Sequence, residues 1–465
     1  MHQYDRLREQ YPLFRYVGYH IAETETTYEL TYDFEIPTLA EFHPRWIFGK
    51  NAAHPIHVQT DAVFRNLVFQ LGMVELVSYW KITCSPRVEV AAGALESEQI
   101  DWWKTLYFGG LGEFFYVNGI KSNPVDFMDI TATGAALPLP AQPQGDLSGT
   151  LVPIGGGKDS AVTLEVLNSL KADNYCYIIN PRGASIETAS AAGYPPERVI
   201  TVRRTLDARM LELNREGYLN GHTPFSAIVA FSAVLTAYIH RIGYVALSNE
   251  SSANESTVAN SSVNHQYSKS FAFEQDFHTY EQNYLRTGVY YFSLLRPLSE
   301  YQIAGLFARS PQYHAVFKSC NAGSKQNIWC AHCPKCLFVY IILSPFLSTA
   351  QLETIFGANL LNDESLKETF EKLTGILPEK PFECVGEREE VNFALCETLR
   401  RMERAGEPLP ALLTYYRTTP VYATHADKKN PFPSYYDETN LLPPAYEALL
   451  QHALESMKQG GDTPC

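Results

Sequence analysis

The chain has 465 residues, of which 45% are hydrophobic and 19% charged, as in an ordinary soluble globular protein, and this length suggests about three domains. Its formal net charge of −14 argues against a general nucleic-acid binder, because phosphate backbones favour basic surfaces, but it allows a small anionic substrate in a local cationic pocket. The N-terminus is too polar for a signal peptide, and the longest uncharged apolar run, Phe225 to Ile239, is too short to cross a membrane. Nine cysteines, an odd number, do not suggest a disulfide framework, so the sequence favours a cytoplasmic protein.

An aromatic-rich α+β domain is expected over residues 1–133. Apolar and polar side chains alternate strictly from Tyr28 to Ile36, which predicts a half-buried strand, and several aromatic stretches follow it. Residues 134–148 are rich in proline and glycine, which predicts a linker.

The stretch "GTLVPIGGGKDSAVTLEVL" predicts a strand, a glycine loop and the start of a helix. Leu151 to Ile154 form a short apolar run, and apolar positions keep helical spacing from Ser160 onward. A second apolar run, Tyr175 to Ile179, follows, so a βαβ unit is the simplest interpretation. Glycines let the backbone approach a phosphate, and the free N–H groups of a first helical turn point at it. The pattern therefore favours an anion site, with a plain strand-to-helix turn as the alternative.

The rest of the chain fits this unit into a larger fold. Residues 149–347 alternate strands and helices, which predicts an α/β fold with a doubly wound parallel sheet and a catalytic domain of this extent. Residues 348–465 are expected to form a helical C-terminal region and a tail rich in proline and tyrosine.

The string "GGGKDS" resembles the PP-loop of the ATP pyrophosphatase superfamily, usually written Ser-Gly-Gly-x-Asp-Ser, with Gly155 where that family usually has serine. This departure removes one hydroxyl donor to phosphate, though a backbone N–H remains. The resemblance implies that ATP is consumed, that the loop holds its pyrophosphate portion with Lys158 adding charge, and that Mg²⁺ accompanies the phosphates. The residues concerned are Gly155, Gly156, Gly157, Lys158, Asp159 and Ser160.

A cysteine quartet is the second strong signal. Its spacing is C-x9-C-x2-C-x2-C, formed by Cys320, Cys330, Cys333 and Cys336. Thiolates at these intervals can surround one tetrahedral ion, and such a site usually staples a loop. We favour structural Zn²⁺, while an iron–sulfur cluster and reduced cysteines without metal stay open. A PP-loop followed by such a quartet resembles the 7-cyano-7-deazaguanine synthases, whose quartet binds zinc.

A polar stretch from Ala246 to Phe277 leaves the carboxyl end of a predicted strand, where open parallel sheets bind ligands. A carboxylate there could hold magnesium, and a histidine or lysine could act as acid, base or phosphate ligand. A polar loop whose asparagines and serines cap turns is the alternative. His222, beside a predicted helix start, is explained equally by ligand contact or by packing. The candidate acids and bases are Glu250, His265, Lys269 and His222, and the candidate substrate contacts are Asn249, Asn254, Glu255 and Arg296.

Longer strings resemble one particular family. The strings "GGGKDS", "GHTPFSA", "ALSNESSANE", "VNHQYSKS", "LLRPLSE", "CPKCLFV" and "FECVGEREE" are together similar to the ATP-dependent UDP-N-acetylmuramoyl-L-alanyl-L-glutamate epimerases of bacterial peptidoglycan synthesis. The resemblance implies inversion of the terminal L-glutamate of this UDP-linked muramoyl dipeptide to D-glutamate through a carboxyl adenylate, with release of AMP and pyrophosphate. The N-terminal domain is then the candidate for recognising the UDP-sugar.

Three other functions stay open at this point. An amidating or nitrile-forming ligase of the deazaguanine type shares the PP-loop and the cysteine quartet. A tRNA thiolase would need a basic face, which the net charge disfavours. A nucleotide-binding regulator would bind ATP without turnover.

Overall fold

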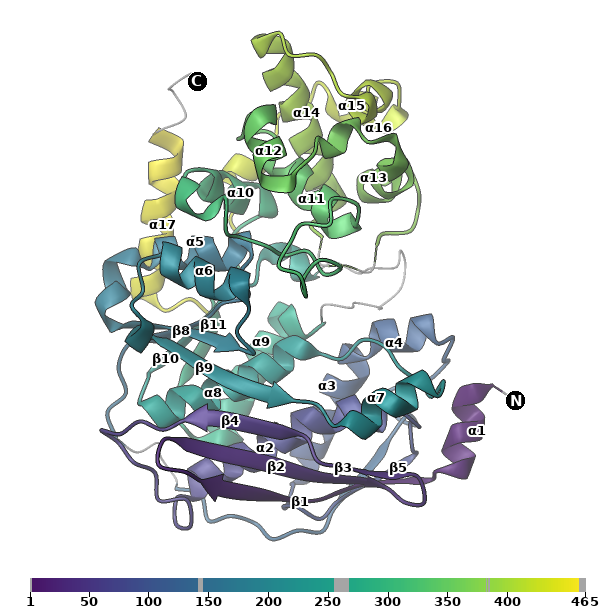
Figure 1. The fold of residues 1–465 in the computed structure, drawn as a ribbon, viewed down its shortest axis with the longest axis vertical. Helices are drawn as coiled ribbons and strands as arrows, with labels where there is room; N and C mark the ends of the chain where they lie inside the picture. Colours follow the sequence, from purple (N-terminus) through teal and green to yellow (C-terminus); the bar gives the residue numbers. More distant parts are fainter. Residues whose placement is uncertain (1, 141–144, 255–266, 382, 384, 460–465) are drawn as a thin grey trace.

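The computed structural model describes residues 2–140, 145–254, 267–381, 383 and 385–459. Its strands are β1 (Leu13–Glu23), β2 (Thr27–Ile36), β3 (Ala40–Phe42), β4 (Arg45–Gly49), β5 (Arg87–Val90), β6 (Asp129–Ala132), β7 (Thr150–Pro153), β8 (Asn174–Ile179), β9 (Val199–Thr205), β10 (Tyr244–Leu247) and β11 (Tyr290–Ser293). They form one eleven-stranded sheet in the order β11-β10-β7-β8-β9-β4-β2-β1-β5-β6, with β3 paired to β2 (Figure 1).

Helices cover both faces of this sheet and form the upper part of the molecule in Figure 1. They are α1 (Gln3–Gln10), α2 (Ala62–Trp80), α3 (Ser97–Gly110), α4 (Gly112–Val117), α5 (Lys158–Val166), α6 (Gly183–Ala191), α7 (Ala208–Arg215), α8 (Phe225–His240), α9 (Phe271–Tyr280), α10 (Glu300–Ala308), α11 (Pro334–Leu343), α12 (Thr349–Phe356), α13 (Lys367–Thr374), α14 (Arg388–Ala405), α15 (Ala411–Tyr416), α16 (Pro420–His425) and α17 (Pro444–Gln459). None of the helices in the described part of the chain is long and apolar enough to cross a membrane.

The sheet is mixed, with mostly parallel pairs. Strands β11, β10, β7, β8 and β9 run parallel to one another, and so do β1, β5 and β6. Strand β4 is antiparallel to both β2 and β9, and it joins the two parallel sets through the pairing of residues 45–47 with residues 203–205. The α/β class is confirmed. The predicted parallel sheet does not stand alone, because β4 extends it into the N-terminal strands.

The central strands are buried on both faces, since successive side chains of a strand point to opposite sides. Leu151 and Val245 belong to the hydrophobic core that includes α2 and α8, whereas Val152 and Ala246 belong to the core that includes α10 and α11. Such two-sided burial leaves the ends of the strands as the places where polar loops can gather.

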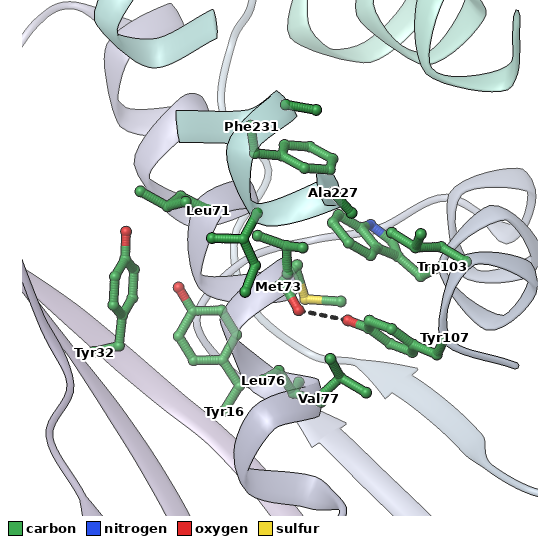
Figure 2. Packing of buried hydrophobic residues seen from close by; sticks show 14 of the residues in the cluster. Tyr16, Tyr32, Leu71, Met73, Leu76, Val77, Trp103, Tyr107, Ala227 and Phe231 are labelled. Atoms are coloured by element: carbon green, nitrogen blue, oxygen red, sulfur yellow. Dashed lines mark hydrogen bonds between the residues drawn. The ribbon is translucent and has the colours of Figure 1, made fainter. Parts of the chain in front are cut away.

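Aromatic side chains fill the core on the α2 side. Every second residue of β2 is buried, which confirms the predicted half-buried strand. Figure 2 shows Tyr107 donating a hydrogen bond of 2.6 Å to the carbonyl oxygen of Met73, and the ring of Trp103 stacks on Phe231 with centroids 5.1 Å apart. Because Phe231 belongs to α8, the N-terminal strands and the parallel strands share one core.

The C-terminal part adds helices and then returns to the sheet. From residue 348 onward the described residues form helices and connections without a strand. Helix α17 contacts α5 and α10, beside which it lies in Figure 1. The hydroxyls of Tyr446 and Thr150 share a hydrogen bond of 2.6 Å, so the last described helix is tied to the strand that precedes the glycine loop.

Candidate active site

The glycine loop, residues 155–157, joins β7 to α5 and requires glycine at one position. Gly156 has a φ of +87°, and a Cβ placed on it would lie 2.8 Å from the carbonyl carbon of Ala184 and from the amide nitrogen of Ser185. Gly157 is the N-cap of α5 and provides no capping side chain. The first N–H groups of α5 therefore lack a side-chain cap, which is the arrangement that binds anions at helix N-termini.

A cavity of about 670 Å³, called the edge cavity below, lies where β7, β8 and β9 end. Ile154 and Gly155 line it after β7, Asn180 after β8 and Leu206 after β9. Its charged lining residues are Arg182, Arg204, Lys269 and Lys318. None of the described residues that line it is an aspartate or a glutamate, although the whole chain carries a net charge of −14. The edge cavity therefore suits an anionic ligand.

A second cavity, of about 510 Å³, lies near the carboxyl ends of β5 and β6. The lining residues include Asn66, Gln70 and residues 135–139 of the proline- and glycine-rich segment. It brings together none of the residues predicted for the site.

Lys158 does not occupy the position expected of it. Its ammonium forms ion pairs with Asp159 and Glu300, its side chain is 2% exposed, and it is not among the residues that line the edge cavity. Burial lowers the pKa of Lys158, but the carboxylates of Asp159 and Glu300 raise it further, and the result is a pKa well above the usual value. That Lys158 adds charge to the phosphate site stays a prediction, although two carboxylates take up its charge in this structure.

Glu300 and Glu390 connect the glycine loop to the C-terminal helices. One carboxylate oxygen of Glu390 accepts the backbone N–H of Glu300 at 2.8 Å, and the other accepts that of Glu387 at 3.2 Å. Burial raises the pKa of Glu300 to about 7, which Lys158 partly offsets, and burial together with Glu300 raises that of Glu390. Both glutamates lie in strings used for the family resemblance, but neither was predicted as a site residue.

Arg296 holds the polar stretch in place from the inside. Its side chain is 0% exposed and pairs with Glu274 at 2.9 Å. It also donates to the backbone carbonyl of Glu250 at 2.7 Å and to that of Lys269 at 2.5 Å. Arg296 thus ties together the two ends of the stretch and lies too deep to meet a ligand in this conformation.

The predicted acids, bases and substrate contacts fall into different places. Lys269 lines the edge cavity, Glu250 is buried, and Asn249 donates to the hydroxyl of Ser293 at 3.0 Å. His222 lies 3.4 Å from Glu113 of α4 and is not among the residues that line the edge cavity. Glu255 and His265 lie outside the described residues, as does the side chain of Asn254.

The cysteine quartet converges as predicted. Its sulfur atoms all lie within 4.8 Å of one another. The distances are 3.8 Å between Cys320 and Cys333, 3.7 Å between Cys330 and Cys336, and 3.5 Å between Cys333 and Cys336. Tetrahedral zinc with bonds of about 2.3 Å needs sulfurs roughly 3.8 Å apart, so these thiols fit a zinc ion.

The segment that carries these cysteines, residues 317–336 and called the cysteine loop below, is built against the glycine loop. The backbone N–H of Lys318 donates to the carbonyl oxygen of Gly156 at 2.7 Å, and a Cβ placed on Gly157 would meet Ser319 at 3.3 Å. Asn327 accepts the backbone N–H of Ala184, in the first turn of α6, at 2.8 Å. The cysteine loop thus contacts the loops that follow both β7 and β8. Lys318 was not predicted as a site residue, and its position two residues before Cys320 is the one signal in the sequence that could have identified it.

Known proteins match this chain over most of its length. Residues 5–294 match the family model described as the MurL N-terminal domain, and residues 316–428 match the MurL C-terminal domain. The chain belongs to the MurL family. The predicted resemblance is confirmed, and so is the expectation of an enzyme of the epimerase class.

Relatives in the MurL family carry the name UDP-N-acetyl-alpha-D-muramoyl-L-alanyl-L-glutamate epimerase. One from Xanthomonas oryzae pv. oryzae is 36% identical over 341 residues, which cover 72% of this chain and 74% of the relative. One from Micromonospora sp. is 35% identical over 349 residues, 74% of this chain and 77% of the relative. No solved structure matches the chain.

Proposed function

We propose that this chain inverts the terminal L-glutamate of UDP-N-acetylmuramoyl-L-alanyl-L-glutamate to D-glutamate, with conversion of ATP to AMP and pyrophosphate, in peptidoglycan precursor synthesis. The observation that carries the proposal is a cavity whose charged lining residues are cations and which is bounded by the glycine loop, in a chain whose relatives are named as epimerases of this substrate.

The geometry supports ATP as the consumed nucleotide. Gly155 lines the edge cavity, and the uncapped N-cap of α5, Gly157, follows two residues later, so a pyrophosphate group would meet backbone N–H groups there. The side chain of Asp159 is 29% exposed at the same helix start, and its carboxylate is a suitable ligand for Mg²⁺ beside the phosphates. The loop is therefore the PP-loop of this proposal.

The chemistry explains why an epimerase would consume ATP. A free α-carboxylate resists loss of the neighbouring proton, because the product would be a dianion. Attack of the carboxylate oxygen on the α-phosphorus of ATP forms an acyl adenylate and releases pyrophosphate. In this mixed anhydride the carboxyl group no longer carries its negative charge, so the α-proton is more acidic, and one group can remove it while another returns a proton to the opposite face. Water then cleaves the adenylate into the D-glutamyl product and AMP.

Lys269 is the acid or base that the geometry supports best. It lines the edge cavity, and the guanidinium of Arg296 donates a hydrogen bond to its backbone carbonyl. Glu250 is held through its own backbone by the same arginine, which makes it the second choice. His265 stays a candidate without a described position, and His222, paired with Glu113, ranks last.

We assign the cysteine quartet to a structural Zn²⁺. All four thiols converge, so a tetrahedral ion bound by them would have no open coordination position, as in zinc sites that stabilise a fold. The ion would hold the cysteine loop against the glycine loop.

The reaction products test this proposal. With the UDP-linked dipeptide, ATP and Mg²⁺, the wild-type protein should form AMP and pyrophosphate in amounts matching turnover. Asp159→Asn should lose this activity, because an amide does not replace the carboxylate on Mg²⁺, while exposed Asp173→Asn should keep it. ADP and phosphate as the sole nucleotide products would contradict the proposal, and an amide of the substrate would favour a ligase instead.

A further inference from the structure

The backbone of Lys318 is fixed on the glycine loop. Its N–H donates to the carbonyl oxygen of Gly156 at 2.7 Å, and the preceding residue, Phe317, is fully buried. The ring of Phe317 lies 4.5 Å from that of Phe307 and 5.2 Å from that of Trp329. Two residues after Lys318 lies Cys320, which is also buried. Lys318 therefore cannot drift away from the loop without breaking this anchor.

The side chain of Lys318 is half-buried and lines the edge cavity. Its ammonium donates to the carbonyl oxygens of Ala315 at 3.0 Å and of Phe317 at 3.2 Å. Among the described residues it forms no ion pair with a carboxylate, and both hydrogen bonds of its ammonium go to backbone carbonyls. An ammonium has three donors, so one remains for a ligand.

Two other cations near the cavity, Lys158 and Arg204, differ in this respect. The charge of Lys158 is taken up by Asp159 and Glu300. The guanidinium of Arg204 donates to both carboxylate oxygens of Glu75, at 2.5 and 2.8 Å. Lys318 places its charge at the cavity wall next to the glycine loop, whereas carboxylates neutralise the charges of Lys158 and Arg204.

We propose that Lys318, rather than Lys158 of the glycine loop, is the lysine that binds the phosphates of the nucleotide. This inference rests on the proposed ATP-dependent function. A phosphate oxygen accepting the third N–H of Lys318 would form a charge-assisted hydrogen bond in a partly water-excluded site, where such bonds are strong. The cysteine loop would then deliver a catalytic-site cation as well as stabilising the fold.

Direct nucleotide binding tests this role. Isothermal titration calorimetry with Mg²⁺ and α,β-methylene-ATP, whose α,β bond cannot be cleaved in the reaction, would be run on the full chain. Lys318→Met and Lys318→Gln remove the charge, and Lys318→Arg keeps it. Lys325→Met is the matched control, because Lys325 is an exposed lysine of the same cysteine loop that does not line the edge cavity.

Removal of the charge at position 318 should weaken binding about 10- to 100-fold, the range for a hydrogen bond to a charged group. Lys318→Arg should retain most of the affinity, and Lys325→Met should bind as the wild type does. Wild-type affinity in both neutral variants would overturn the inference while leaving the proposed function intact, and so would an equal loss in Lys325→Met. A wild-type protein that binds no nucleotide would instead contradict the proposed function itself.

Discussion

The backbone at Gly156 gives a sharp prediction for one methyl group. In Gly156→Ala the new Cβ would lie 2.8 Å from two backbone atoms of the turn that starts α6, which cannot rotate away as a side chain could. The φ of +87° adds the cost of a left-handed residue, about 1–2 kcal/mol, and the overpacking adds about 1–3 kcal/mol. The variant should therefore lose about 2–5 kcal/mol of unfolding free energy, a large share of the 5–15 kcal/mol of a typical domain.

Gly155→Ala is the matched control one residue away. No atom lies within 4 Å of a Cβ placed on Gly155, and its φ is outside the left-handed region. The free energy of unfolding of this variant should change by less than about 1 kcal/mol. Gly155→Ser, which restores the residue usual in PP-loops, should be tolerated equally. The measurement is chemical denaturation followed by circular dichroism; equal midpoints for Gly156→Ala and Gly155→Ala would refute the loop conformation described above.

Three further predictions follow from the other clusters. Elemental analysis of protein purified without added metal should find about one zinc per chain, and a strong chelator should lower the unfolding midpoint, because metal binding contributes to folding; iron with visible absorption would show a cluster instead. Glu300→Ala should lower the free energy of unfolding by about 3 kcal/mol, at the lower end for breaking a buried ion pair, because Asp159 still faces Lys158. Glu397→Ala, which breaks a partly exposed ion pair, should lower it by less than about 1 kcal/mol. Equal losses in the two variants would refute the buried cluster. Burial lowers the pKa of His240 to about 4, so below pH 6.5 the unfolded chain binds a proton that the folded chain does not, and stability should fall by up to about 1.4 kcal/mol per pH unit between pH 6.5 and 4. His240→Gln should reduce this dependence of the unfolding free energy on pH. An unchanged pH dependence would contradict the assignment of a lowered pKa to His240.

The sequence predicted what depends on short stretches of chain. The half-buried strand at residues 28–36 follows from alternation alone, and the convergence of the cysteines follows from their close spacing. The glycine loop was recognisable because strand, loop and helix are consecutive. Each of these features needs no knowledge of distant partners.

What the sequence missed depends on contacts between distant residues. The ammonium of Lys158 is paired with Glu300, 142 positions away, and the backbone N–H of Glu300 is bound by Glu390, 90 positions further along the chain. Lys318 reaches the glycine loop through one backbone hydrogen bond to Gly156. The pairing of β4 with β9 likewise joins segments that no local pattern connects. Charged residues were therefore found as candidates, but their roles followed from the fold.

The proposed mechanism requires that activation by ATP precedes proton exchange at the glutamate α-carbon. The direct measurement is incubation of the protein in heavy water with the UDP-linked L-alanyl-L-glutamate substrate and Mg²⁺, with and without ATP, followed by chiral analysis and mass spectrometry of the glutamate. We expect D-glutamate carrying solvent deuterium at its α-carbon only when ATP is present. Free L-glutamate should react poorly, because binding energy from the nucleotide and sugar is needed to position the carboxylate. Deuterium entering without ATP would contradict the adenylate mechanism, and consumption of ATP with retained L-glutamate would contradict the epimerase function.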